Sequence, residues 1–133
     1  MRIIIIEDDY YIFQDLSRFL EAEGFTAHFH TNIADAVRSL LAEEFDLMLL
    51  DYHLPGLNGT DALPIIQEVS PQLPVILMVH ETTQEDQEKA LRAGAFCILK
   101  KPINHRTLLR AIRSARESPP QKRENEENRS PRQ

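Results

Sequence analysis

The chain has 133 residues, of which 42% are hydrophobic and 27% charged, a composition typical of one soluble globular domain. Its formal net charge is −6, so it has no basic excess with which to bind nucleic acid unaided. The single cysteine, Cys97, excludes an intramolecular disulfide and favours a reducing compartment. Four isoleucines between Arg2 and Glu7 are too few for a signal peptide or a membrane span, and a cytoplasmic location without membrane contact is expected.

Short apolar runs alternate along the chain with stretches of helical periodicity. The apolar runs, which predict strands buried on both faces, cover residues 2–6, 25–29, 45–51, 74–79 and 96–99. The helical stretches run from about Ile12 to Gly24, from Asn32 to Leu41, and over residues 60–69, 83–93 and 105–116. Five strand-helix repeats predict an α/β fold, a single doubly wound (βα)5 domain with a five-stranded parallel sheet.

The composition changes near residue 117. Residues 118–133 contain three prolines, mixed charge and no large apolar side chain, so they cannot contribute a hydrophobic core. We therefore expect one domain over residues 1–117 and a disordered polar tail, or the start of a linker, over residues 118–133.

Charged and polar residues gather where the predicted strands end. Glu7 and Asp8 follow the first strand, Asp51 ends the third, His80 follows the fourth and Lys101 follows the fifth. The carboxyl ends of parallel strands share one edge of a doubly wound sheet, which is where such sheets bind ligands. Converging carboxylates would be stabilised by a divalent cation, and oxygen ligands of this kind suit Mg²⁺.

A carboxylate, a hard cation and an ammonium group are the parts needed to form an acyl phosphate on an aspartate. Asp51 is the predicted phosphoacceptor, and Lys101 the predicted phosphate contact. Simpler interpretations stay open: Glu7 and Asp8 belong to a solvated acidic loop, Asp9 only caps the first helix, or Asp51 only begins a turn.

These motifs resemble a two-component response-regulator receiver domain over residues 1–117. The resemblance rests on the acid pair after the first strand, the loop from Asp51 to Gly59, and Lys101 followed by Pro102. Pro74-Val75-Ile76 and Ala93-Gly94-Ala95 complete the pattern. It implies a flavodoxin-like fold with strand order 2-1-3-4-5.

The resemblance also implies residue roles. Asp51 accepts a phosphoryl group from a phosphohistidine on a sensor histidine kinase or phosphotransfer protein. Glu7, Asp8, Asp51 and the backbone carbonyl of His53 hold Mg²⁺, with Asp8 the more direct ligand of the acid pair. Lys101 contacts the phosphoryl group, and the peptide bond between it and Pro102 is cis.

Three positions depart from the family pattern. Val79 stands where a Ser or Thr hydroxyl contacts the phosphate, and Ile98 stands where a Tyr or Phe couples phosphorylation to the output face. His80, where a small residue is usual, either shapes the site or is an exposed loop residue. It narrows the approach to Asp51 or supplies a replacement N–H. Val79 and Ile98 are alternatively plain core residues without a switching role.

Three functions compete. The leading hypothesis is a phosphorelay receiver, not a turnover enzyme, that signals to a partner or effector domain. The alternative is a degenerate receiver that acts as a phosphorylation-independent interaction module. A Mg²⁺-dependent phosphatase is disfavoured because His53 occupies the position of its usual second acid. A homodimer through the fourth and fifth helices is permitted but not required.

Overall fold

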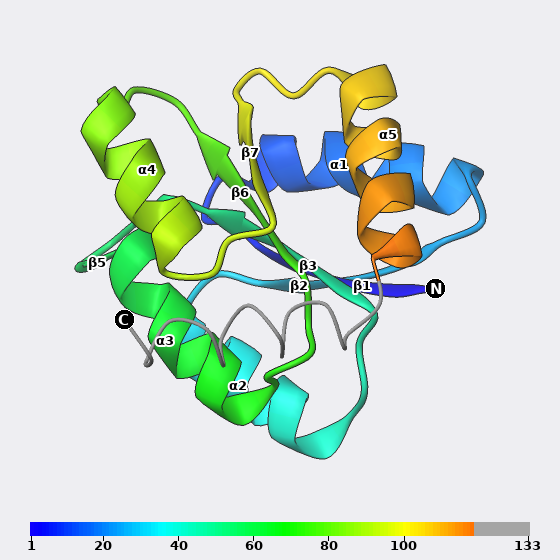
Figure 1. The fold of residues 1–133 in the computed structure, drawn as a ribbon. Coiled ribbons are helices and arrows are strands. Elements are labelled where there is room, and N and C mark those ends of the chain that lie inside the picture. Colours follow the sequence, from blue (N-terminus) through cyan, green and yellow to red (C-terminus); the bar gives the residue numbers. More distant parts are fainter. Residues whose placement is uncertain (119–133) are drawn as a thin grey trace.

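The structure, a computed structural model, describes residues 1–118 as alternating strands and helices (Figure 1). The strands are β1 (Arg2–Ile6), β2 (Thr26–His30), β3 (Leu47–Asp51), β4 (His53–Leu54), β5 (Leu57–Asn58), β6 (Val75–Val79) and β7 (Cys97–Lys100). The helices are α1 (Tyr10–Ala22), α2 (Ile33–Ala42), α3 (Gly59–Val69), α4 (Gln84–Arg92) and α5 (His105–Glu117). Most of the tail predicted over residues 118–133 lies outside the described residues.

Five strands form one parallel sheet in the order β2-β1-β3-β6-β7. Counted over these five strands, this is the predicted order 2-1-3-4-5, so the flavodoxin-like fold is confirmed. All five residues of both β3 and β6 are buried, as expected for central strands covered on both faces.

Two hydrophobic layers sandwich the sheet. Alternate side chains along each strand, such as Ile4 and Leu50, point to one face of the sheet and pack with residues of α2, α3 and α4. The side chains between them, such as Ile5 and Leu49, point to the other face and pack with residues of α1 and α5. Figure 1 shows α1 and α5 on one face and the other three helices on the opposite face. This alternation fixes which strand residues point toward which helices.

The helix ends carry the capping groups that the sequence predicts. Asp9 caps α1 by accepting hydrogen bonds from the backbone N–H groups of Tyr11 and Ile12 at 2.9 and 3.2 Å. At the other end of α1, Gly24 has φ +90°, and the N–H of Phe25 donates to the Leu20 carbonyl. This is a Schellman motif, which confirms Gly24 as the residue that closes the helix.

The connection after β3 differs from the predicted simple loop. His53 and Leu54 pair antiparallel with Asn58 and Leu57, forming the two-residue strands β4 and β5. A short hairpin of this kind leaves no periodicity in the sequence, because each strand has only two residues. These backbone pairings fix the conformation of the connection that directly follows Asp51.

Several element boundaries also shift. The second and fifth strands begin one residue later than predicted, β3 begins at Leu47 instead of Phe45, and β6 begins at Val75. Pro64 lies at the sixth position of α3, so the Thr60 carbonyl lacks its usual donor. Pro64 is exposed, so that carbonyl can be hydrated.

Candidate functional site

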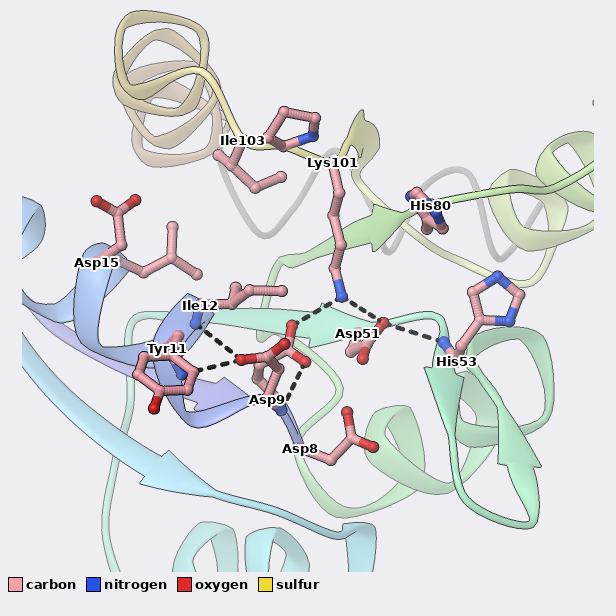
Figure 2. Close-up of a pocket in the computed structure, with 13 residues that line it drawn as sticks. Asp8, Asp9, Tyr11, Ile12, Asp15, Asp51, His53, His80, Lys101 and Ile103 are labelled. Atoms are coloured by element: carbon pink, nitrogen blue, oxygen red, sulfur yellow. Dashed lines mark hydrogen bonds and ion pairs between the residues drawn. The ribbon is translucent and has the colours of Figure 1, made fainter.

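The carboxylates predicted to converge do so at the carboxyl edge of the sheet (Figure 2). One carboxylate oxygen from each of Glu7, Asp8 and Asp51 lies within 4.8 Å of the others. β1 pairs with β3 in register through Ile6 and Leu50, so both strands end at the same level. Glu7 is fully buried and Asp51 is 2% exposed, whereas Asp8 is exposed at the mouth of the site.

Lys101 reaches into this cluster from the end of β7. Its Nζ lies 2.9 Å from Glu7 Oε2 and 3.0 Å from Asp51 Oδ1. Burial lowers the pKa of Lys101, but its hydrogen bonds to Glu7 and Asp51 and their negative charges outweigh burial and raise it. Lys101 is therefore an ammonium group held among carboxylates, and its peptide bond to Pro102 is cis as predicted.

Glu7 is the most strongly perturbed acid of the cluster. Burial raises its pKa to about 7, against the lowering effects of Lys101 and of the Asp9 N–H, which donates to Oε1 at 3.1 Å. The nearby Asp51 carboxylate raises the pKa further. Three acids thus face one ammonium, and the site carries unbalanced negative charge when all of them are ionised.

Asp51 presents one carboxylate oxygen to the protein and keeps the other available. Both the Lys101 ammonium and the His53 backbone N–H, at 3.1 Å, contact Oδ1. Oδ2 has no hydrogen bond or ion pair within residues 1–118. A carboxylate held by one oxygen with the other unengaged is suited to act as a nucleophile.

The donor set fits a divalent cation. Glu7 Oε2 is buried, and within the described residues its partner is the Lys101 ammonium at 2.9 Å, which it shares with Asp51. A hard cation would take up this oxygen together with those of Asp8 and Asp51, and carboxylate oxygens are the ligands that Mg²⁺ prefers.

A cavity of about 710 Å³ opens above the cluster. Besides the acids it is lined by Tyr11, Ile12 and Asp15 of α1 and by Pro102 and Ile103 after β7. Sequence reasoning did not assign these residues to the site. The sequence offers one hint of them, the pair of adjacent tyrosines at the start of α1. In the structure Tyr11 of this pair is 80% exposed.

The two atypical switch positions lie in one apolar layer. Val79, at the end of β6, is 1% exposed, and its carbonyl accepts a hydrogen bond from the Lys101 N–H at 2.7 Å. Ile98, on β7, is partly buried against the same hydrophobic cluster. Neither side chain offers a hydrogen-bond donor to the site.

The two histidines near Asp51, His53 and His80, differ in the contacts that their side chains make. The exposed His53 lies with its Nε2 3.0 Å from the Glu81 carbonyl, so its imidazole connects the loops that follow β3 and β6. The sequence predicted only a backbone role for His53. His80 is exposed and is among the residues that line the cavity, and its role in shaping the site stays a prediction.

Residues 3–113 match the response regulator receiver domain family. The chain belongs to this family. It is 34% identical over 113 residues to the transcriptional regulatory protein CpxR homolog of Haemophilus influenzae, covering 85% of this chain and 49% of that protein. The chain spans about half the length of the curated relatives it matches.

Two solved receiver domains show the same fold. A CheY-like receiver domain protein from Methanospirillum hungatei is 29% identical, with a TM-score of 0.81 over 94% of this chain and 97% of that one. The receiver domain of sensor histidine kinase PA1611 from Pseudomonas aeruginosa is 28% identical, with a TM-score of 0.78 over 88% and 98%. The latter holds a magnesium ion in its active-site cleft.

As a response regulator receiver domain, the protein belongs to two-component phosphorelay signalling. Within residues 1–118, no helix is both long enough and apolar enough to cross a membrane.

Proposed function

We propose that Asp51 accepts a phosphoryl group from a phosphohistidine donor on a sensor histidine kinase or phosphotransfer protein. In this reaction a carboxylate oxygen forms a bond to phosphorus, and the phosphorus–nitrogen bond of the donor breaks. The electron pair of that bond stays on the donor imidazole, which takes up a proton. The observation that carries the proposal is that Asp51 lines the cavity with its Oδ1 held by Lys101 and His53, while its Oδ2 has no hydrogen bond or ion pair within residues 1–118.

The surrounding residues are suited to hold the transferred group. When Asp51 becomes an acyl phosphate, negative charge moves from its carboxylate to the phosphoryl oxygens, and the Lys101 ammonium can follow it. Glu7 keeps Lys101 in position through the second ion pair. Lys101 therefore both orients Asp51 before transfer and offsets charge afterwards.

We propose that Glu7, Asp8, Asp51 and the backbone carbonyl of His53 hold Mg²⁺. A bound Mg²⁺ would offset the negative charge of the incoming phosphoryl oxygens. The three converging carboxylates, with the Lys101 ammonium as their cationic neighbour, support this assignment.

Intact-mass measurement tests the acceptor directly. The protein is incubated with Mg²⁺ and acetyl phosphate, alongside Asp51→Asn and Asp61→Asn as a matched surface control. We expect the wild type and Asp61→Asn to gain one phosphoryl group and Asp51→Asn to gain none. A gain in Asp51→Asn equal to that of the wild type would refute Asp51 as the acceptor.

The buried Val79 favours a second candidate, a phosphorylation-independent interaction module. Without a donor at that position, the phosphoryl group has a weaker connection to the face formed by α4, β7 and α5. Backbone amide NMR shifts with and without beryllofluoride distinguish the two functions. Large shifts across α4 and α5 support switching, whereas shifts confined to the loops around Asp51 support the module.

We further propose that residues 1–117 act as a signalling domain without substrate turnover, passing the state of Asp51 to an effector domain or protein partner in the cytoplasm. One such partner is a second copy of this chain, because the exposed apolar side chain of Leu91 on α4 is available for a homodimer contact through α4 and α5. Hydrolysis of a generic phosphate ester well above background would contradict the assignment as a non-enzyme.

A further inference from the structure

The end of β6 carries a histidine without a role in the reaction proposed above. His80 immediately follows Val79, and its exposed side chain lines the same cavity as Asp51 and Lys101. Within residues 1–118, His80 makes no hydrogen bond, ion pair or ring contact. Its imidazole is therefore able to turn toward a ligand in the cavity.

His80 lies at the same end of the sheet as Asp51. Asp51 is the register partner of Met78, and register partners on parallel strands point to the same face. His80 is the second residue after Met78, just beyond the end of β6 at Val79, so it lies about 7 Å further along the chain. Figure 2 shows His80 at the end of β6, between Lys101 and His53 on the rim near Asp51.

Two other side-chain donors near Asp51, those of Lys101 and His53, already have partners in the protein. The Lys101 ammonium contacts two carboxylates, and the His53 Nε2–H donates to the Glu81 carbonyl. Val79 offers no donor, because its side chain is apolar and packs among other buried apolar residues. A phosphoryl group brings three acceptor oxygens into a cavity otherwise rich in acids, so an additional N–H would be strongly favoured.

We propose that His80 binds the phosphoryl group carried by Asp51, donating an imidazole N–H to one of its oxygens. It thereby supplies the contact that Val79 cannot make. The inference rests on the proposed function and deepens it, because it assigns a further phosphoryl-binding residue to the site.

Binding of beryllofluoride in the presence of Mg²⁺, followed by NMR titration, tests the role of His80. We expect His80→Ala to weaken the affinity about tenfold or more, as for loss of a hydrogen bond to a charged group. His80→Gln keeps an N–H donor and should recover part of the loss. Glu81→Ala is the matched control, since it lies on the same loop but its side chain does not line the cavity.

Two further measurements separate this role from others. The thermal shift caused by Mg²⁺ alone should be the same in His80→Ala and the wild type, because His80 is not among the predicted metal ligands. The lifetime of the aspartyl phosphate should not increase in His80→Ala. A longer lifetime would assign the imidazole to water activation and overturn the inference.

Equal beryllofluoride affinity in His80→Ala and the wild type would also overturn it, as would a loss that Glu81→Ala reproduces. Neither result would contradict the proposed function, provided that Asp51→Asn abolishes beryllofluoride binding. Failure of the wild type itself to bind beryllofluoride would instead overturn the proposed function, and the role of His80 with it.

Discussion

At the scale of single residues, Val79 is where the chain departs most informatively from the receiver pattern. We expect Val79→Thr to destabilise the unmodified protein by about 1–2 kcal/mol, because it buries a hydroxyl in an apolar layer. With beryllofluoride and Mg²⁺ bound, the hydroxyl gains a partner and the penalty should shrink. Urea unfolding with and without the mimic measures both values.

Val79→Ala is the control for this comparison, since it removes apolar volume without adding a hydroxyl. Its cost should be the same in the presence and absence of beryllofluoride. If Val79→Thr behaves like Val79→Ala in this respect, the end of β6 does not sense the phosphoryl group.

Cys97 should be an unreactive thiol. Burial raises its pKa from 9.0 to about 11, so at pH 8 the thiol holds its proton and far less thiolate is present than in an exposed cysteine. Because the thiolate is the nucleophile, we expect alkylation by iodoacetamide about 100-fold slower than in the denatured protein at this pH. The rate should still be rising above pH 9, and a plateau near that pH would contradict the shifted pKa.

Which charged residues meet at the site was predictable from the sequence, because that depends only on where parallel strands end. Glu7, Asp51 and Lys101 each follow or end an apolar run, and the structure brings them within ion-pair distance. The contact of His53 with the Glu81 carbonyl was not predictable. It depends on the paths of two loops and on a side-chain rotamer, neither of which leaves a periodic pattern.

At the scale of elements, two glycines end helices in the same way but in different surroundings. Gly24 and Gly94 follow α1 and α4 with φ +90° and +116°. A Cβ at Gly24 would meet nothing within 4 Å, whereas one at Gly94 would overlap the Gln67 side chain of α3. The backbone penalty is shared, and the steric penalty belongs to Gly94 alone.

We expect Gly24→Ala to lower the free energy of unfolding by about 1–2 kcal/mol, the cost of the left-handed conformation. Gly94→Ala should cost more, and the excess should largely disappear in the double variant Gly94→Ala/Gln67→Ala relative to Gln67→Ala. Denaturant unfolding of the four variants measures this excess. Equal costs at both glycines would show that Gln67 moves away freely.

Element types were predicted more securely than their limits. Long apolar runs and helical periodicity identify the five main strands and five helices, since burial imposes those patterns over many residues. Strand ends moved by one or two residues, as at Leu47, because pairing with the neighbouring strand decides them. The β4–β5 hairpin depends on only two residue pairs and left no pattern to detect.

At the scale of the whole molecule, the acid cluster couples stability to metal binding. Glu7, Asp8 and Asp51 crowd around a single ammonium, so the metal-free fold retains repulsion that a divalent cation would relieve. A ligand that binds only the folded state stabilises it by an amount set by its concentration relative to its dissociation constant. At tenfold excess over that constant, we expect Mg²⁺ to stabilise the protein by about 1.4 kcal/mol, raising Tm by about 6 °C.

The variant Asp8→Asn separates the charge repulsion in the metal-free protein from the stabilisation by bound Mg²⁺. Asp8 is exposed and, within residues 1–118, has no hydrogen bond or ion pair, so the change should leave the metal-free Tm equal or slightly higher. It removes one charged ligand, so most of the Mg²⁺-induced shift should be lost. Glu88→Gln, an exposed acid on α4, changes the net charge equally and should keep the full shift. Thermal unfolding with Mg²⁺ and with EDTA decides the matter: if Asp8→Asn and Glu88→Gln respond alike, Mg²⁺ acts through general charge screening and not through this cluster.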